Sequence, residues 1–236
     1  MPDFTLYHLP GSMSTAPHWL LLDLARTQNV TFDTVIVDVH AGAQFDPAFL
    51  AINPKGKIPA LVAHNDPTSP GVVVTEAPAI MYYLASRFAP HLIPAASAPA
   101  ADVARFNEAL AFFASTLSAD IRNWFFAGEE GERLVPGWSG ADANTVRRLT
   151  RPRLEKDYAF LDGVLAERKF VAGDSLSIVD YLVVAATSLS TGLLSFAGKH
   201  AHVKALIDSL HSSDGWKELV VKDKFAPGSG DEAWGL

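Results

Sequence analysis

Two short segments of the chain combine residue types that suit the binding of a small peptide-like ligand. The first, residues 53–62, is a turn rich in glycine and proline that leads into a short apolar run, with Pro59 at its entrance. A proline is tolerated at the first residue of a strand, where it donates no backbone hydrogen bond. We therefore expect the backbone beside it, at Ile58, to be free to pair with another partner.

The second segment, residues 75–80, places Glu76 at the expected start of a helix. The first backbone N–H groups of a helix have no partner within the helix, and they attract an anion. Together with the turn before Pro59, this helix start predicts a slot for a small ligand that carries both an amine and a carboxylate.

The composition limits the possible chemistry. The 236 residues are 49% hydrophobic and 19% charged, which allows a full core in one large or two small domains. A net charge of −7 argues against nucleic acid or an anionic membrane as a partner. The chain has no cysteine, which excludes disulfides, zinc–thiolate sites and catalysis by a protein thiol. Any sulfur chemistry must come from a bound thiol, and no metal site is expected.

The N-terminal segment does not have the pattern of a signal peptide, because no charged region precedes an apolar run and Asp23 interrupts residues 19–25. No uninterrupted apolar window is long enough to cross a membrane. We expect a cytoplasmic protein.

Strand and helix patterns alternate over residues 1–88. Short β-prone runs are expected at residues 4–8, 32–39, 60–62 and 72–74, and helical patterns at 17–24, 45–52 and 76–88. The two apolar runs on either side of residues 65–71 indicate a hairpin, because the intervening residues form a strong turn cluster. The predicted order, βαβ-α-ββα, is that of a thioredoxin-like domain.

Residues 89–101, rich in Pro, Ala and Ser, are predicted to be an interdomain linker. Beyond them only helical patterns remain, at 103–126, 145–165, 177–194 and 202–213, so residues 102–236 are predicted to form an all-α bundle. The polar, Gly-rich residues 128–143 are interpreted as an insertion, with a mobile loop over a site as the alternative. The predicted fold class is α+β.

The segment 170–180 contains a helix-start signal. Ser177 suits the N-cap position, and Asp180, three residues later, completes a capping box. Its expected role is structural, since it would start a buried helix without touching a substrate.

Taken together, the turn before Pro59, the Glu76 helix start and the Ser177–Asp180 signature resemble the glutathione S-transferase family over nearly the whole chain, in style closest to bacterial beta-like and fungal members. The resemblance implies a cis Pro59, with Ile58 pairing with the cysteinyl backbone of glutathione. Glu76 and the backbone N–H of Ala77 would hold the γ-glutamyl end. Ala77 replaces the family's serine, and the lost hydroxyl would cost about 1 kcal/mol of binding.

The family also has an activating hydroxyl or thiol at the start of the first helix. On this resemblance Met13 stands where bacterial-type members have a cysteine, so glutaredoxin-like chemistry is disfavoured, and Ser14 would stabilise the glutathione thiolate. A plain helix cap is the alternative for Ser14, with Ser12 and Tyr7 as the next candidates for activation.

Two further groups of residues are assigned from the same resemblance. Lys57 and His40 would meet the glycine carboxylate of glutathione, unless they are ordinary surface residues. The second substrate should be apolar, because the expected helix after the linker is rich in aromatic residues. Most of the apolar side chains along one face of this helix are expected to lie in the core. Ser118 and Trp124 are the predicted walls of the substrate pocket.

The sequence therefore predicts a glutathione-dependent transferase that presents the glutathione thiolate to an apolar electrophile. One alternative is glutathione-dependent cis–trans isomerisation of a conjugated double bond in a natural-product pathway. Another is a non-catalytic glutathione-binding or regulatory protein on the same fold. By the same resemblance we expect a homodimer with the helix at residues 80–88 in its interface.

Overall fold

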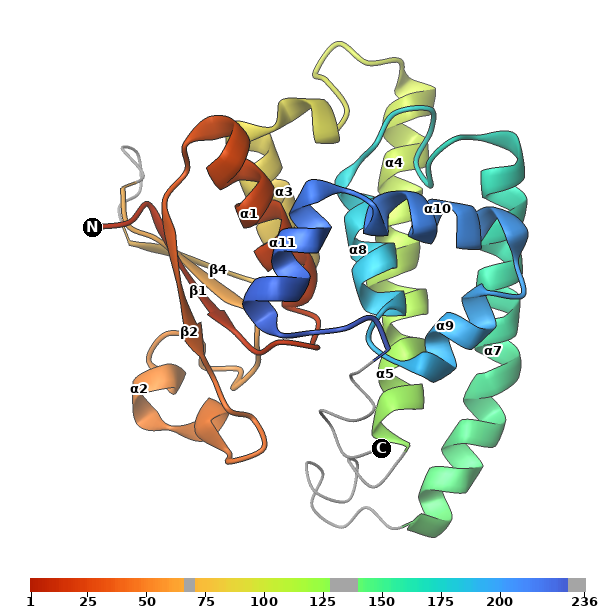
Figure 1. Ribbon diagram of the computed structural model, residues 1–236, viewed down its shortest axis with the longest axis horizontal. Coiled ribbons are helices and arrows are strands. Elements are labelled where there is room, and N and C mark those ends of the chain that lie inside the picture. Colours follow the sequence, from red (N-terminus) through yellow and green to blue (C-terminus); the bar gives the residue numbers. More distant parts are fainter. Residues whose placement is uncertain (66–70, 128–139, 229–236) are drawn as a thin grey trace.

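The computed structural model describes residues 1–65, 71–127 and 140–228, and its ribbon has a sheet part and a helical part side by side (Figure 1). The sheet has four strands in the order β2-β1-β3-β4. Their bounds are β1 Phe4–His8, β2 Phe32–Ile36, β3 Ala60–Ala63 and β4 Val72–Thr75. β1 is parallel to β2 and antiparallel to β3, and β3 and β4 form the predicted hairpin, of whose turn residues 66–70 lie outside the described residues.

Two helices lie between the sheet and the helical part: α1 Thr15–Gln28 and α3 Ala77–Phe88 (Figure 1). Buried residues follow one another without interruption in the first half of α1, from Thr15 to Leu22, as expected for a helix covered on two sides. A 3-10 turn at Ala43–Phe45 and the short helix α2 Pro47–Leu50 precede β3.

The helical part begins with α4 Ala100–Phe112, a π-helical segment at Phe113–Leu117 and α5 Ser118–Phe126. These three follow one another directly, and residues 100–126 are called the first rod of the helical part. The remaining helices are α7 Gly140–Glu167, α8 Ile178–Thr187, α9 Thr191–Ala197, α10 Ala201–His211 and α11 Asp214–Asp223. After residue 75 the described residues contain no named strand, only the isolated bridge between Phe170 and Gly173. The predicted α+β fold class is confirmed.

Several details differ from the sequence-based expectation, among them the helix α11, which follows the expected helix at 202–213 and was not predicted. The single helix expected at 177–194 is divided into α8 and α9, because Ser190 caps a new helix with its side chain accepting a hydrogen bond from the Leu193 N–H. A short 3-10 helix, Pro90–Leu92, lies within the expected linker. Most of the expected insertion at 128–143 lies outside the described residues.

The capping box that starts α8 is confirmed. The Ser177 hydroxyl accepts a hydrogen bond from the Val179 N–H at 3.2 Å, and Asp180 accepts one from the Ser177 N–H at 2.8 Å. A second carboxylate oxygen of Asp180 accepts from the Val171 N–H, so this residue also fixes the preceding bend.

One hydrophobic core joins the two parts. The Trp19 ring of α1 packs on Tyr181 of α8 at 4.4 Å and on Trp216 of α11 at 4.8 Å between ring centroids. The Tyr181 hydroxyl also donates to Asp23 of α1 at 2.9 Å. Because the parts share a core, the proposed boundaries at residues 88 and 102 stay predictions.

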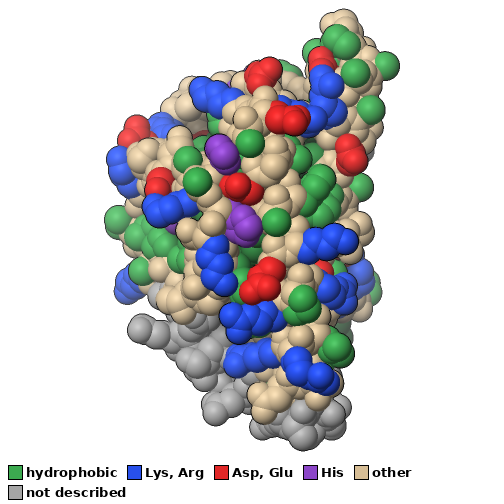
Figure 2. All heavy atoms as spheres, turned by 90° about the vertical axis from the view of Figure 1, so that its right-hand side faces the viewer, with side chains coloured by type: hydrophobic (Ala, Val, Ile, Leu, Met, Phe, Trp, Pro, Cys, Tyr) green, Lys and Arg blue, Asp and Glu red, His purple; other side chains and the backbone are tan. Residues whose placement is uncertain are grey.

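The face of the helical part that points away from the sheet carries Lys, Arg, Asp and Glu side chains next to one another, with apolar side chains scattered among them (Figure 2). Neighbouring charges of α7 also pair, for example Arg151 with Glu155 at 3.3 Å. Among the described helices, none has the length and apolar character needed to cross a bilayer.

Candidate active site

The turn before β3 is built around a buried asparagine. The Asn53 side chain donates to the carbonyl of Lys57 and accepts from the Lys55 N–H, which closes the turn on itself. Gly56 has a φ of +59°, and a Cβ there would lie 3.3 Å from the Gln44 carbonyl oxygen, so a glycine is required. The predicted cis bond between Ile58 and Pro59 is present.

The start of α3 has an unusual backbone. Glu76 occupies the N-cap position with a φ of +71°, its side chain makes no capping hydrogen bond, and the carboxylate is exposed. A non-glycine residue in this region of φ is strained, and such residues cluster at ligand sites. Ala77, the next residue, is buried at the first turn of α3.

Lys55 connects these two segments. Its ammonium group forms an ion pair with Glu76 and donates to the Thr75 hydroxyl at 2.8 Å. The two segments expected from the sequence to share a ligand are therefore adjacent, and the residue that joins them was not among the predicted site residues.

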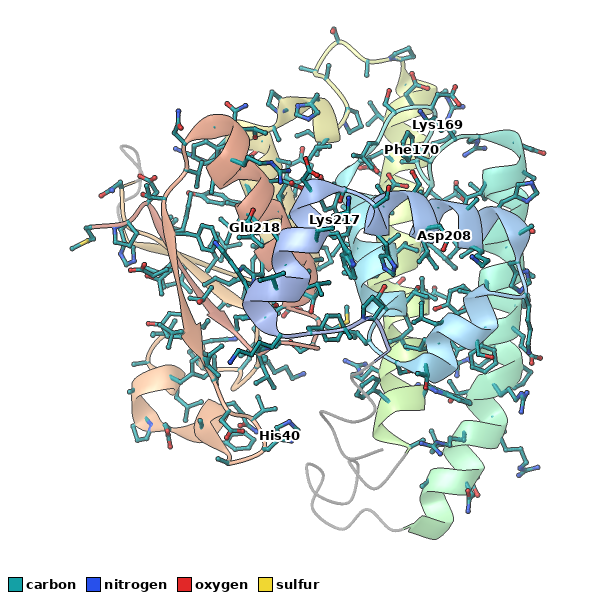
Figure 3. The ribbon with its side chains drawn as sticks, viewed as in Figure 1. His40, Lys169, Phe170, Asp208, Lys217 and Glu218 are labelled. Carbon is teal, nitrogen blue, oxygen red and sulfur yellow. The ribbon has the colours of Figure 1, made fainter. Side chains whose placement is uncertain are left out.

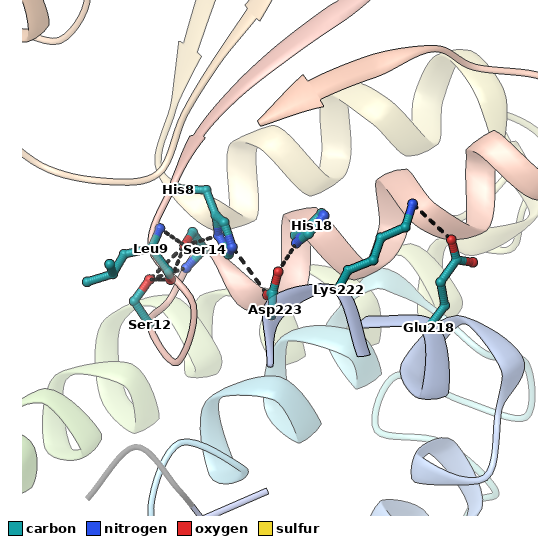
Figure 4. Close-up of polar contacts among 8 residues, drawn as sticks. All are labelled: His8, Leu9, Ser12, Ser14, His18, Glu218, Lys222 and Asp223. Carbon is teal, nitrogen blue, oxygen red and sulfur yellow. Dashed lines mark hydrogen bonds and ion pairs between the residues drawn. The ribbon is translucent and has the colours of Figure 1, made fainter. Parts of the chain in front are cut away.

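The start of α1 is a network of hydroxyl groups (Figure 4). Ser14 stands at the N-cap, but its side chain makes no capping hydrogen bond. Instead its oxygen lies 2.7 Å from His8 Nδ1 and 2.6 Å from the Ser12 oxygen, and it accepts from the Leu9 N–H at 3.1 Å. The Ser14 side chain therefore does not cap α1, and its role in activating a thiol stays a prediction.

The two serines of this network differ in exposure. Ser14 is 0% exposed and Ser12 is 8% exposed, while Tyr7 is half-buried and packs against Phe49. A ligand that approaches from solvent meets Ser12 first. The Ser14 hydroxyl lies behind the Ser12 hydroxyl, to which it is hydrogen-bonded.

Behind Ser14 lies a buried group of three side chains: His8, His18 and Asp223 (Figure 4). His8 Nε2 is 3.2 Å and His18 Nδ1 is 2.9 Å from the Asp223 carboxylate. Burial lowers the pKa of His8, and its neighbour Asp223 opposes this only in part. Burial alone would raise the pKa of Asp223, but the two histidines together hold this pKa below its ordinary value.

The other predicted glutathione contacts lie in the sheet part. Lys57 is exposed, and its carbonyl is held by Asn53. His40 is half-buried in the segment between β2 and α2, where its N–H donates to Asp38 (Figure 3).

The predicted pocket residues lie on the first rod of the helical part. The Ser118 hydroxyl donates back to the Ala114 carbonyl at 2.9 Å. The Trp124 ring meets Phe196 of α9 edge-on at 5.0 Å, and the Arg147 guanidinium lies 5.7 Å from its centroid. These contacts are within the helical part. As expected, most of the apolar stripe is core, with Phe113, Leu117 and Ile121 almost fully buried.

Comparison with known proteins agrees with this arrangement. Residues 2–86 match the model of the glutathione S-transferase N-terminal domain, and residues 143–214 match that of the C-terminal domain. The two matches together cover more than half of the chain. The chain belongs to the glutathione S-transferase family. The prediction of a glutathione S-transferase-type enzyme is thereby confirmed.

The chain is similar to glutathione S-transferases from several organisms. The chain is 29% identical to glutathione S-transferase D6 of Drosophila melanogaster over 81% of this chain and 79% of that protein. It is 28% identical to glutathione S-transferase 3 of Zea mays over 96% of this chain and 97% of that protein. The structure of glutathione transferase URE2P8 of Phanerochaete chrysosporium, solved with oxidized glutathione, superposes with a TM-score of 0.77. The two sequences are 17% identical, and the match covers 95% of this chain and 96% of that one.

The sequence reasoning missed Lys55 and the group behind Ser14. Lys55 lies in the same turn as the predicted Lys57, and the reach of its side chain depends on the folded turn. His8, His18 and Asp223 lie in three distant segments, so their only signal in the sequence was a histidine at the end of a strand and another in the next helix.

Proposed function

We propose that this glutathione S-transferase binds reduced glutathione between the turn before Pro59 and the start of α3. The observation that carries the proposal is the junction of the two segments through Lys55, with a strained Glu76 at an uncapped helix start. The ligand's cysteinyl backbone would pair with Ile58, and its γ-glutamyl amine and carboxylate would meet Glu76 and the Ala77 N–H. Oxidized glutathione in the structure of URE2P8 from Phanerochaete chrysosporium supports the choice of a glutathione ligand.

The thiol of glutathione would lie at the start of α1. A free thiol has a pKa of about 8.5, and lowering it by about two units needs roughly 2.7 kcal/mol of preference for the thiolate. One hydrogen bond to the anion contributes about 1.5–3 kcal/mol, and the helix N-terminus adds to it. Ser14 remains the proposed donor, and its burial makes Ser12, which touches it, the direct competitor for contact with the sulfur.

The second substrate is proposed to be an apolar electrophile that the thiolate attacks. Support comes from the aromatic side chains of the first helical rod, of which Phe112 and Trp124 are only partly buried. Reversible addition to a conjugated double bond would use the same thiolate and return glutathione unchanged. Product analysis separates the outcomes, since conjugation consumes glutathione and isomerisation does not.

A homodimer through α3 is part of the proposal. Tyr82 on α3 and Val73 on the neighbouring strand β4 are exposed at 46% and 40%, which is high for large apolar side chains. Ile80, by contrast, is fully buried in the chain's own core, so only the outer face of α3 would contribute. Sedimentation should give twice the chain mass of 25.4 kDa. A cytoplasmic location stays a prediction.

The activating hydroxyl is tested with three variants: Ser14→Ala, Ser12→Ala and, as a control, Ser115→Ala, an exposed helical serine that bonds only its own helix. The variant that loses the donor should turn over an activated aryl chloride about 10–100-fold more slowly, the cost of about 1.5–3 kcal/mol. Its bound thiol should have a raised pKa, seen as weaker thiolate absorbance at neutral pH, with glutathione affinity nearly unchanged.

Unchanged turnover and thiol pKa in both Ser14→Ala and Ser12→Ala would reject a serine donor. Absence of both glutathione binding and conjugation in the unmodified protein would reject the proposed function as a whole.

A further inference from the structure

Three side chains from distant segments converge behind the start of α1 (Figure 4). His8 is the last residue of β1, His18 lies in the first turns of α1, and Asp223 is the last residue of α11. One potential ligand atom from each lies within 4.8 Å of the others. The exposed Lys222–Glu218 pair of α11, drawn beside them, belongs to the surface and not to this cluster.

The facing atoms are buried and incompletely satisfied. His8 Nε2, His18 Nδ1 and Asp223 Oδ2 are shielded from solvent, and none has a hydrogen bond of acceptable geometry in the described part of the chain. His8 Nε2 and His18 Nδ1 lie 3.2 and 2.9 Å from different oxygens of the Asp223 carboxylate. Buried polar atoms without a hydrogen-bond partner are rare. Three such atoms that face one point suggest that a bound partner belongs between them.

The position of Asp223 adds a second, independent observation. It is the last residue of α11, and the following Lys224 ends the helix in the left-handed conformation with a φ of 50°. The carbonyl end of a helix carries partial negative charge and disfavours a carboxylate. A buried acid at this end needs positive charge beside it.

We propose that His8 Nε2, His18 Nδ1 and Asp223 bind one divalent metal ion of the zinc type. Two imidazoles and a carboxylate are a common donor set for Zn²⁺, with metal–ligand distances of about 2.0–2.2 Å. Tetrahedral ligands at that distance lie roughly 3.3 Å apart, which compares with nitrogen–oxygen distances of 3.2 and 2.9 Å and with a limit of 4.8 Å for the whole set. The second oxygen of Asp223 or a water completes the coordination.

The surroundings of His8 match those of a metal-bound histidine. Its other ring nitrogen, Nδ1, lies 2.7 Å from the Ser14 oxygen, so the ring is held with Nε2 facing the cluster. A ligating histidine usually donates its second N–H to such a partner. The ion would then fix a proton on Nδ1, and Ser14 would accept that hydrogen bond.

The site is tested on untagged, full-length protein that has been stripped with a chelator. Titration with zinc chloride should reveal one ion per chain and a higher melting temperature, and cobalt substitution should give the visible absorption of a tetrahedral nitrogen–oxygen site. His18→Gln and Asp223→Asn should each weaken zinc binding by more than about 100-fold, since changes outside the ligand set already cost about 10–100-fold.

The matched control is His202→Gln. His202 faces Asp162 at 3.4 Å in an exposed histidine–aspartate pair, and the change should leave zinc binding intact. If the ligand variants do not fold, X-ray absorption of the zinc-loaded wild-type protein decides, with two imidazoles expected on the metal. No binding by the wild-type protein, zinc retained by folded His18→Gln and Asp223→Asn, or fewer than two imidazoles would overturn the proposal and leave a purely hydrogen-bonded cluster.

Discussion

The helices α3 and α8 both begin next to an acidic side chain, and they use it in opposite ways. At the start of α8, Asp180 accepts from the Ser177 N–H, the Ser177 hydroxyl accepts from the Val179 N–H, and Asp180 is fully buried. At the start of α3, Glu76 caps nothing, its side chain is 66% exposed, and its backbone has a positive φ.

The difference separates a structural helix start from a binding one. Where the free N–H groups are satisfied internally, as in α8, the acid contributes to stability. Where they are left open beside a strained residue, as in α3, the cost is tolerated because a ligand supplies the missing partners. Changes at α8 should therefore affect the fold, and changes at α3 should affect glutathione.

The largest effect is expected for Asp180→Ala. It leaves the N–H groups of Val171 and Ser177 buried without an acceptor, at about 1–3 kcal/mol each. Urea unfolding should show a loss of about 3–5 kcal/mol, while the exposed neighbour Asp174→Ala should change little. Weaker glutathione binding by the remaining folded protein would contradict the division of roles.

Asp157 on α7 differs from Asp180 in its hydrogen bonding. It is also a buried carboxylate, but its Oδ2 has no hydrogen-bond partner in the described structure. Burial, together with the nearby Asp120, raises its pKa to about 6, against the attraction of Arg153 and Lys156. The folded chain then holds this proton more tightly than the unfolded chain does, so stability falls as pH rises from about 4 to 6.

Asp157→Asn should remove this residue's part of the dependence, while buried Asp180, whose pKa is also raised to about 6, keeps its own part; the variant should be more stable at pH ~8 by about 1–3 kcal/mol. For a chain of this size each kcal/mol corresponds to a melting temperature higher by roughly 2–4 °C. Thermal melts across the pH range measure it. A variant that melts lower than the wild-type protein at pH ~8 would count against the assignment.

At α3, Ala77→Ser should strengthen glutathione binding. The added hydroxyl at the first turn supplies one more hydrogen bond to the ligand carboxylate, worth about 1 kcal/mol or roughly fivefold in affinity. Calorimetry measures the gain. Unchanged affinity with an unchanged melting temperature would mean that the ligand carboxylate lies elsewhere.

The smallest effect is expected for Lys55→Ala. The pair with Glu76 is exposed, so its loss should weaken glutathione binding by only about fivefold or less, and less still at high salt. Lys204→Ala breaks another exposed pair, with Asp208, and serves as the control. A large loss of stability in Lys55→Ala, absent from the control, would assign Lys55 to the fold.

The fold could be predicted because its signals are local. Apolar spacing placed the strands and most helices, and the Ser177–Asp180 box depends on residues three apart. The break before α9 was missed, since Ser190 caps a helix inside a continuous apolar pattern. Within the candidate site, the sequence predicted only those features whose residues lie close together in the chain.

The contacts that cross segments were not visible in the sequence. The ion pair of Lys55 with Glu76 depends on the closed turn around Asn53. The cluster of His8, His18 and Asp223 depends on α11 returning to the sheet part, and the sequence alone led us to expect no metal site.

The central claim is that the open start of α3 holds the γ-glutamyl end of glutathione. Calorimetric titration of glutathione and of cysteinylglycine, which lacks that end, into the wild-type protein and Glu76→Gln tests it most directly. A charge-assisted hydrogen bond of about 1.5–3 kcal/mol predicts that the wild-type protein prefers glutathione by about 10-fold or more, and that Glu76→Gln loses most of this preference. An equal preference in both proteins would contradict the account.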